Sequence, residues 1–197
     1  MLTEKLILAS QSPRRAEILT AVGWEFEAIA ADIDETRFTA EDAVSYVKRL
    51  ARTKAETIAQ RFPDRLVLGA DTVVVIAGEI FGQPRDDDDA RRMLRLLSGK
   101  WHEVLTGVAL VRGRLSQVLV EHQTTRVLFA EMSAAEIDWY VSTGEPQGKA
   151  GAYGIQGLAS LFIKEIQGDY FNVVGLPVRL LFELSRRVDA AAAALRW

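Results

Sequence analysis

The sequence predicts an α/β fold built around a mixed sheet. β-forming segments and amphipathic helical segments alternate along most of the chain. Two neighbouring β-forming segments, residues 103–111 and 115–129, flank Arg112-Gly113-Arg114 and resemble a hairpin. The chain has 197 residues, of which 49% are hydrophobic. That length suits a single domain over residues 1–197, built either as one body or as two lobes around a shared core.

The N-terminal region predicts two short strands separated by a helix. Residues 6–9 form an apolar run typical of a buried strand, and residues 26–29 resemble a second one. Between them, Ser12 is suited to cap a helix, and Pro13 fits the first helical position because no useful donor is lost there. Gly23 ends this helix.

The middle of the chain predicts a long helix, a strand and a second helix. The long helix covers about residues 41–62, and residues 66–76 form a strongly β-forming run that turns at Ala77-Gly78. The next helix follows Asp86 and ends near Gly99. The aspartates that open it precede several arginines, so they are better read as cap and helix-dipole partners than as metal ligands.

The C-terminal part predicts two helices and one strand. Residues 133–136 form a capping box that opens a helix, and Gly144 stops it. A strand is expected over residues 161–166, and Pro177 starts a last amphipathic helix. We expect the alanine-rich tail after about residue 188 to be frayed.

Composition argues against several classes of function. The formal net charge is −3, whereas general nucleic-acid binding needs a basic surface, so no nucleic-acid partner is expected. The chain has no cysteine, which excludes disulfides and thiolate metal sites and fits a cytoplasmic protein. No apolar run approaches the roughly 18–20 residues that span a bilayer, and the first residues do not resemble a secretory signal.

Asp71 is the first residue that resists a purely structural explanation. It lies within the apolar run of residues 66–76, which is expected to be buried on both faces. An unpaired buried carboxylate is costly, so Asp71 should form an ion pair, bind a metal or take part in catalysis. The structural alternative is a bulge or strand end, favoured by Gly69, that exposes the side chain to water.

Lys54 falls on the apolar stripe of the long predicted helix. Taken alone, it is more simply explained as a lysine whose stem lies along the core while its ammonium reaches water. The functional alternative is an ammonium directed into an anion-binding site.

Residues 10–15 combine hydroxyls, a helix N-terminus and two arginines after a short strand. Free backbone donors at a helix N-terminus favour phosphate, and arginine binds phosphate oxygens in a bidentate manner. A capped surface helix with solvated arginines explains the same pattern, so the segment suggests a phosphate site without requiring one.

Residues 148–157 contain four glycines, which allow the backbone to approach a ligand closely. Lys149 and Gln156 could contact that ligand, although a flexible loop would also explain the glycines. The segment is a poor match to a phosphate-binding P-loop because no Gly-Lys-Ser/Thr closes it. His102 and His122 lack the spacing of metal ligands.

Taken in order, these segments resemble the Maf family of nucleotide pyrophosphatases. The resemblance covers the chain to about residue 185 and rests on residues 8–15 (Leu-Ala-Ser-Gln-Ser-Pro-Arg-Arg), 34–35, 51–55, 69–74 (Gly-Ala-Asp-Thr-Val-Val), 82–86, 97–99, 149–157 and 174–177. Each motif alone is weak, but the ordered set is specific.

The resemblance implies a fold related to inosine triphosphate pyrophosphatases, with a curved mixed sheet, flanking helices and two lobes around a cleft. It also implies a homodimer and a hydrolase that cleaves nucleoside triphosphates to the monophosphate and pyrophosphate with a divalent cation, typically magnesium or manganese. The family name refers to inhibition of septum formation, so a nucleotide sensor without catalysis is an alternative from another class.

The resemblance also assigns roles to individual residues. Glu35 and Asp71 would hold the metal, and Asp71, Glu35 and Lys54 would carry catalysis. Whether Asp71 acts as a metal ligand or as the base that accepts a proton from the attacking water stays open, because a directly bound carboxylate is a weaker base. The substrate-binding residues would be Ser10, Arg14, Arg15, Thr72, Gln83, Lys149 and Gln156.

Three positions distinguish branches of the family. Arg14, Thr72 and Gln156 resemble the dTTP/UTP pyrophosphatases rather than the 7-methyl-GTP pyrophosphatases, which stay the alternative. An amide at Gln156 can both donate and accept, as the edge of uracil or thymine requires. One position departs from the family, because Gln83 stands where a lysine is usual. Arg85 is the nearby cation that could compensate.

Overall fold

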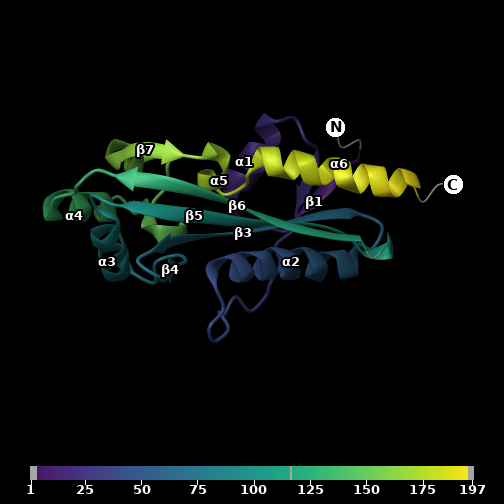
Figure 1. The fold of residues 1–197 in the computed structure, drawn as a ribbon, viewed down its shortest axis with the longest axis horizontal. Coiled ribbons are helices and arrows are strands. Elements are labelled where there is room, and N and C mark those ends of the chain that lie inside the picture. The colour runs from purple at the N-terminus through teal and green to yellow at the C-terminus, as the bar shows by residue number, and fades with distance from the viewer. Residues whose placement is uncertain (1–3, 116, 195–197) are drawn as a thin grey trace. The chain divides into compact units, whose positions relative to one another are not determined.

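The computed structural model describes residues 4–115 and 117–194 and has the mixed α/β architecture that the sequence predicts (Figure 1). Its strands are β1 (Leu6–Leu8), β2 (Phe26–Ala28), β3 (Leu66–Ile76), β4 (Glu79–Phe81), β5 (Trp101–Arg112), β6 (Gln117–Phe129) and β7 (Ile163–Gln167). Its α-helices are α1 (Pro13–Ala21), α2 (Ala43–Arg61), α3 (Asp87–Leu97), α4 (Ala134–Ser142), α5 (Tyr170–Val174) and α6 (Val178–Ala194). Short 3-10 segments are η1 (Gly113–Leu115), η2 (Ala150–Ala152) and η3 (Leu158–Phe162).

Hydrogen-bonded strands follow the order β2-β1-β3-β5-β6-β7, and β4 pairs with β3. β1 is parallel to both β2 and β3, whereas β3–β4 and β6–β7 are antiparallel, so the sheet is mixed. The chain divides into two compact units. The first contains the residues up to Asp71, Thr106–Gln123 and those from Gly175 onward; the second contains Thr72–Leu105 and Thr124–Val174.

In the first unit, helix α2 packs closely against the strands because two glycines remove the side chains that would separate them. A Cβ on Gly69 of β3 would lie 2.0 Å from the carbonyl oxygen of Ala51, and one on Gly107 of β5 would lie 2.2 Å from that of Val47. The buried side chains of α2 join those of β1, β3 and β5 in one apolar cluster. Figure 1 shows α2 and α6 on opposite sides of these strands.

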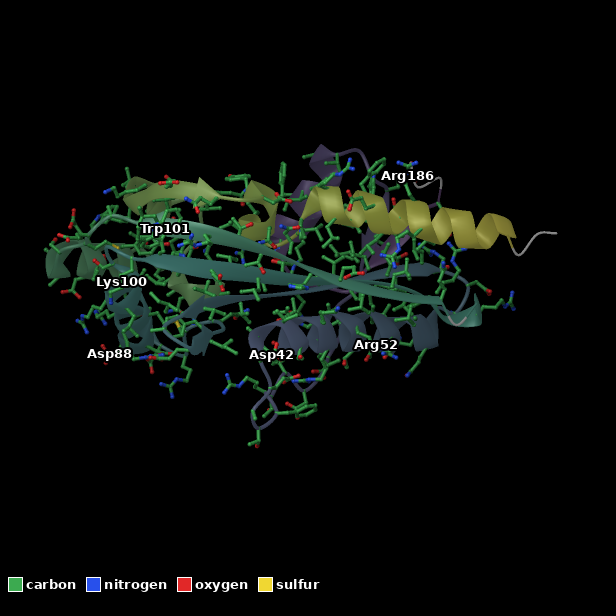
Figure 2. All side chains as sticks on the ribbon, in the orientation of Figure 1. Asp42, Arg52, Asp88, Lys100, Trp101 and Arg186 are labelled. Atoms are coloured by element: carbon green, nitrogen blue, oxygen red, sulfur yellow. The ribbon has the colours of Figure 1, made fainter. Side chains whose placement is uncertain are left out.

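Helix α2 is amphipathic, as its sequence predicts, with one exception that matters for function. Arg52 lies on its outer side and forms an ion pair with Glu56 over 2.7 Å (Figure 2). Lys54, only two residues away, is 9% exposed and faces the strands. Lys54 is therefore not a solvated surface lysine.

The second unit has its own apolar core, formed by side chains of β3–β6, α3, α4 and the segment that follows α4. His102, Phe129 and Tyr153 lie in this core with their rings edge to face, at centroid distances of 4.8–5.4 Å. Such T-shaped arrangements match the positive edge of one ring to the negative face of another.

Most sequence-predicted elements are confirmed, with shifts of one to three residues at their ends. Asp86 caps α3 and Ser133 forms the predicted capping box with Glu136, since both side chains accept the expected backbone hydrogen bonds. Asp88 and Asp89 pair with arginines of α3, which confirms their reading as helix-terminal partners. Among the described residues, no helix is long and apolar enough to cross a membrane.

Several local expectations differ from the structure. Ser12 occupies the N-cap position of α1, but its hydroxyl makes no capping hydrogen bond; its backbone N–H donates to the Ser10 hydroxyl. β4 and α5 were not predicted, since three and five residues are too short to show a periodicity. The first two residues of the strand expected over residues 161–166 are the end of η3, and the strand begins at Ile163.

The last helix also differs from its prediction. α6 continues to Ala194, through the alanine-rich segment that was expected to fray after about residue 188. Alanine has the highest helix propensity of all residues, which favours continuation of a helix that packing has already started.

Candidate active site

Strand β3 and helix α2 bring Asp71 and Lys54 together in the first unit. Side chains two residues apart on a strand share a face, so Asp71 projects on the same side as Gly69, against which α2 packs. Lys54 is one helical turn beyond Ala51, the residue whose carbonyl contacts Gly69. The close approach that glycine permits therefore places the ammonium beside the carboxylate.

The Lys54 ammonium is shared by two carboxylates. Its Nζ lies 2.7 Å from Oδ1 of Asp71 and 2.7 Å from Oε1 of Glu35. Asp71 is 8% exposed, whereas the side chain of Glu35 is 54% exposed. The group thus reaches from the core to the surface, with Asp71 at its inner end and Glu35 at its outer end.

Burial raises the pKa of Asp71 above the ordinary value of an aspartate, and the positive charges of Lys54 and Arg15 oppose that rise. A carboxyl group with a raised pKa is a better proton acceptor than an ordinary aspartate at neutral pH. The alternative prediction, in which a bulge or strand end exposes Asp71 to water, is wrong, because Asp71 is buried within β3.

Ser10 and Arg15 form a second part of the site at the start of α1. The Ser10 hydroxyl accepts hydrogen bonds from the Ser12 N–H and from Nη1 of Arg15, both at 3.1 Å. Nε of Arg15 donates to the carbonyl oxygen of Gly175 at 2.8 Å, which fixes the plane of the guanidinium. The positive charge of Arg15 also interacts with the negative charges of Asp71 and Glu35, so Arg15 belongs to the same cluster of charged side chains.

Arg14 precedes Arg15 in the first turn of α1 and is half-buried. Burial lowers the pKa of its guanidinium and Glu17 opposes that effect. With two arginines and one lysine, the first unit places three cations and two carboxylates near a helix N-terminus. Such an arrangement can bind an anion and also hold a proton acceptor.

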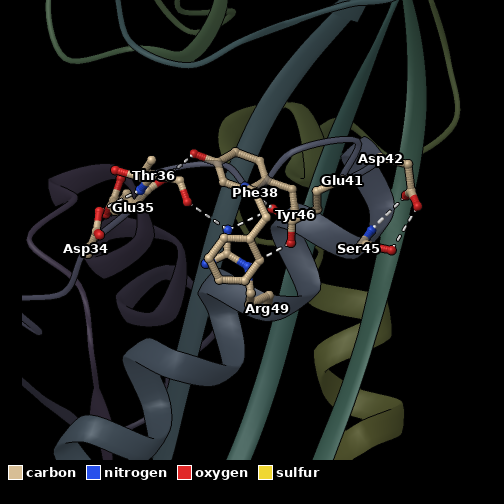
Figure 3. Close-up of polar contacts among 9 residues, drawn as sticks. All are labelled: Asp34, Glu35, Thr36, Phe38, Glu41, Asp42, Ser45, Tyr46 and Arg49. Carbon is tan, nitrogen blue, oxygen red and sulfur yellow. Dashed lines mark hydrogen bonds and ion pairs between the residues drawn. The ribbon is translucent and has the colours of Figure 1, made fainter.

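The segment that carries Glu35 is held against the start of α2 by side chains that sequence reasoning missed (Figure 3). The Tyr46 hydroxyl donates to the carbonyl oxygen of Glu35 at 2.7 Å. Arg49 donates to the carbonyl of Thr36 at 3.1 Å and makes two hydrogen bonds with the carboxylate of Glu41. Its guanidinium also lies 4.0 Å from the ring centroid of Phe38.

These contacts form a clamp on the Glu35 segment, made by Tyr46 and Arg49 of α2. No local sequence pattern marks them, because their partners lie up to thirteen residues away along an irregular segment. Asp34 makes a local turn instead, accepting the Thr36 N–H at 2.8 Å.

The second unit gathers other predicted substrate-binding residues. The N–H of Gly151 donates to the carbonyl of Gly82 at 3.0 Å, which joins the segment of Gln83 to the loop of Lys149 and Gln156. Gly151 itself adopts φ = 69° and approaches β3 so closely that a Cβ would lie 2.6 Å from the Val74 side chain. Only glycine combines this conformation with this approach.

Individual side chains in that unit are placed as follows. Gln83 and Gln156 are exposed, and Thr72 is half-buried on β3 next to Asp71, pointing to the opposite face of the strand. The Lys149 ammonium donates to the carbonyl of Glu145. The loop is not a flexible connection, since its backbone is hydrogen-bonded at several positions.

Arg85, the cation considered as a substitute for the usual lysine at Gln83, pairs with another partner. Its Nε lies 3.3 Å from Oδ2 of Asp89, and its backbone N–H donates to the same oxygen. Its side chain is 81% exposed. In this structure, Arg85 therefore neutralises an aspartate of α3.

The predicted site residues thus form two groups, one in each unit. The first contains Ser10, Arg14, Arg15, Glu35, Lys54 and Asp71; the second contains Gln83, Lys149 and Gln156, with Thr72 on β3 beside the first. Within the described residues, no three histidine or acidic side chains gather as a metal cluster. The carboxylates of Glu35 and Asp71 both contact the Lys54 ammonium. Magnesium is commonly held by one or two carboxylates plus phosphate oxygens of the substrate.

Comparisons with known proteins show the family of the chain. The model of the family described as "Maf-like protein" matches residues 5–188. The chain belongs to the Maf-like protein family. The family match covers both groups of site residues, so this Maf-like protein has its predicted site residues within the region that defines the family.

Two relatives of this Maf-like protein have similar length and about half of its residues in common. A protein of Symbiobacterium thermophilum named "dTTP/UTP pyrophosphatase" is 53% identical over 175 residues, covering 89% of each chain. A protein of the same name from Syntrophus aciditrophicus is 51% identical over 183 residues, covering 93% of this chain and 89% of its own. Among solved structures, the Ham1 protein of Staphylococcus aureus matches with a TM-score of 0.48 at 15% identity, covering 65% of this chain and 73% of its own.

Proposed function

We propose that this Maf-like protein hydrolyses dTTP and UTP to the nucleoside monophosphate and pyrophosphate. Its relatives at about 50% identity over nine-tenths of the chain carry that activity in their names. The observation that carries the proposal is the buried Asp71–Lys54 pair, which Glu35 and Arg15 join beside the N-terminus of α1. A structural protein has little use for so costly an arrangement of charges.

The chain's own residues supply two kinds of assistance to hydrolysis. Asp71 accepts the proton of the water that cleaves the anhydride between the α- and β-phosphates, and its raised pKa suits that role. Lys54 and Arg15 offset the negative charge of the triphosphate, and Ser10 with the first turn of α1 fixes the position of its phosphates. In the second unit, Lys149 offers a further cation, and Gln156 offers an amide that can both donate to and accept from the edge of a pyrimidine base.

A divalent cation, magnesium or manganese, completes the proposal. Glu35 and Asp71 fit such an ion, because one oxygen of each carboxylate lies 2.7 Å from Nζ of Lys54, which brings both carboxylates to one place, and magnesium takes oxygen ligands. When bound, the ion would polarise phosphate oxygens and offset their charge. Titration of Mn²⁺ alone into the wild-type protein and into Glu35→Gln, followed by calorimetry, tests this. Equal affinities would exclude Glu35 as a ligand.

The decisive experiment for the proposed activity is the release of pyrophosphate from a panel of triphosphates. We expect kcat/KM for dTTP and UTP to exceed that for dATP, GTP and 7-methyl-GTP. Orthophosphate as the first product would overturn the reaction type, and a preference for 7-methyl-GTP would favour the alternative branch. Binding of nucleotides without turnover would instead support a sensor.

The proposal includes a homodimer in the cytoplasm. Both features rest on the resemblance of the chain to its family, and the absence of cysteine agrees with a reducing compartment. Sedimentation analysis of the purified chain tests the dimer, and fractionation of cells that express it tests the location.

A further inference from the structure

Glu145 lies at the base of the loop that carries Lys149 and Gln156, and it contacts both ends of that loop. Its backbone carbonyl oxygen accepts a hydrogen bond from the Lys149 ammonium. Its carboxylate accepts hydrogen bonds from the backbone N–H groups of Leu158 at 2.8 Å and Ala159 at 3.3 Å, two residues that follow Gln156 closely in the chain. The Tyr140 hydroxyl donates to the same carboxylate at 2.9 Å and fixes its orientation.

The glycines of the loop fit around this carboxylate. A Cβ on Gly157 would lie 2.5 Å from both carboxylate oxygens of Glu145, far inside van der Waals contact. A Cβ on Gly154 would lie 2.8 Å from the Lys149 side chain, which runs across it. Two of the four glycines are therefore explained by Glu145 and its lysine partner rather than by flexibility.

The middle of the loop is anchored separately. Gly151 is tied to Gly82, next to Gln83. Tyr153 is 5% exposed, and its hydroxyl oxygen lies 2.8 Å from Nε2 of His102 in the core of the unit. Both neighbours of Gln156 are held, Ile155 by burial and Gly157 by the hydrogen bond from its N–H to the carbonyl of Gly154, so the exposed amide side chain has a fixed starting point.

From these contacts we infer that Glu145 is a positioning residue that sets the nucleotide selectivity of the loop carrying Lys149 and Gln156. It contacts no part of the triphosphate site of the first unit among the described residues. It acts by holding Lys149 and Gln156 of the loop in one fixed arrangement. The inference rests on the proposed function for the identity of that nucleotide.

The test compares Glu145→Gln with Glu136→Gln. The amide keeps the size of the side chain but removes one of the acceptor oxygens used by Tyr140, Leu158 and Ala159. Glu136 also accepts a hydrogen bond from a backbone N–H, that of Ser133 at the start of α4 and outside the loop, so it is the matched control.

We expect Glu145→Gln to accelerate amide hydrogen exchange at residues 157–159 and to raise KM for dTTP about 10-fold with a smaller change in kcat. The ratio of kcat/KM for dTTP to that for GTP should fall by a similar factor. Glu136→Gln should change neither. Faster exchange with an unchanged ratio would show that Glu145 supports the fold only, and unchanged exchange would show that it does not hold the loop; either result overturns the inference.

A second pair of variants serves if Glu145→Gln does not fold. Gly157→Ala should lower selectivity because the added methyl displaces the carboxylate, whereas the same change in a Glu145→Ala background should add little. Additive effects would overturn the inference.

Binding of α,β-methylene dTTP and of the matching GTP analogue, measured by calorimetry, separates this inference from the proposed activity. If the wild-type protein binds the dTTP analogue but releases no pyrophosphate from dTTP, the proposed function fails, and the loss of selective binding in the variants still decides the role of Glu145. If the wild-type protein binds neither analogue, both fail.

Discussion

At the scale of single residues, the site depends on one buried carboxylate whose charge is opposed by burial and supported by neighbouring cations. Asp71 and Lys54 pair over 2.7 Å inside the first unit, and Glu35 joins them from the surface. Because burial dominates the raised pKa of Asp71, its ionised form is costly to the fold. A residue kept at such a cost is expected to act in catalysis.

We predict that Asp71→Asn lowers kcat at least 100-fold while the protein stays folded, because an amide accepts no proton. Since the folded-state pKa of Asp71 is raised, its contribution to stability is present at acid pH and lost as pH rises. The stability of the variant relative to wild type should therefore increase from pH 4 to pH 7. Denaturant unfolding and steady-state kinetics measure the two effects.

The matched control is Asp89→Asn, which changes another buried aspartate paired with arginines. Loss of the Asp89 carboxylate should destabilise the start of α3 and leave kcat within about twofold of the wild-type value. Near-normal turnover in a folded Asp71→Asn protein would show that Asp71 is structural.

Gln83 is the second residue-scale test. It is exposed, and Arg85 next to it pairs with Asp89 rather than filling the place of the usual lysine. Gln83→Lys should therefore raise kcat/KM roughly 5- to 150-fold, since a well-placed charge contributes about 1–3 kcal/mol to the transition state. The gain should decrease as salt screens the pair. A lower kcat/KM would mean that Gln83 makes hydrogen bonds that an ammonium cannot.

At the scale of elements, helix α2 organises the first unit in two ways. Its middle presents Lys54 to β3, through the close contact at Gly69, and its first turns hold the Glu35 segment through Tyr46 and Arg49 (Figure 3). One rigid helix thereby fixes the distance between the inner and outer carboxylates. Sites built on such elements keep their geometry better than sites on loops.

Tyr46→Phe removes the hydrogen bond to the Glu35 carbonyl and keeps the aromatic ring. A hydrogen bond of this kind contributes about 1 kcal/mol, so we expect kcat/KM to fall about fivefold. Excess Mn²⁺ should restore part of the loss if Glu35 holds the metal. Kinetics over a range of Mn²⁺ concentrations measure this.

Ser45→Ala is the control for the same turn of α2. It removes the hydroxyl contact of Ser45 with Asp42 at 2.8 Å and leaves the Glu35 segment untouched. An equal loss of activity in both variants would indicate a general effect on the start of α2 rather than a role in holding Glu35.

At the scale of the whole molecule, two compact units share three long strands of the chain, because β3, β5 and β6 each contribute residues to both. Each unit has an apolar cluster of its own. His102 packs against Phe129 and Tyr153 of the second cluster and is 2% exposed. Burial lowers its pKa from 6.5 to about 4, because the charged imidazolium would lose its hydration.

This histidine predicts how stability depends on pH. Because the pKa of His102 is lower in the folded protein than in the unfolded chain, the neutral imidazole contributes stability that is present above pH 6.5 and lost as the pH falls toward 4. The shift corresponds to about 3 kcal/mol of unfolding free energy. His102→Gln should therefore flatten the decrease of stability between pH 6.5 and pH 4, measured by denaturant unfolding.

Tyr153→Phe provides the control, since it removes the hydroxyl near His102 and leaves the imidazole in place. It should lower stability by a similar amount at every pH. A wild-type protein whose unfolding free energy is constant from pH 6.5 to pH 4 would contradict the prediction.

The sequence by itself determined the types and order of the main elements and the identity of the family. Hydrophobic periodicity and capping residues act locally, so the strand of residues 66–76, the helix after Asp86 and the capping box at Ser133 could be predicted without long-range information. The unusual position of Asp71 in an apolar run was visible for the same reason.

Only the tertiary structure decided which charges meet. Taken without the family resemblance, Lys54 was better explained as a solvated lysine; the structure buries it, because Gly69 lets α2 approach β3 and brings the ammonium to two carboxylates. Glu145 and Arg49 gave no signal in the sequence, since their partners lie up to fourteen residues away. Such pairings depend on chain path and packing, which no local pattern encodes.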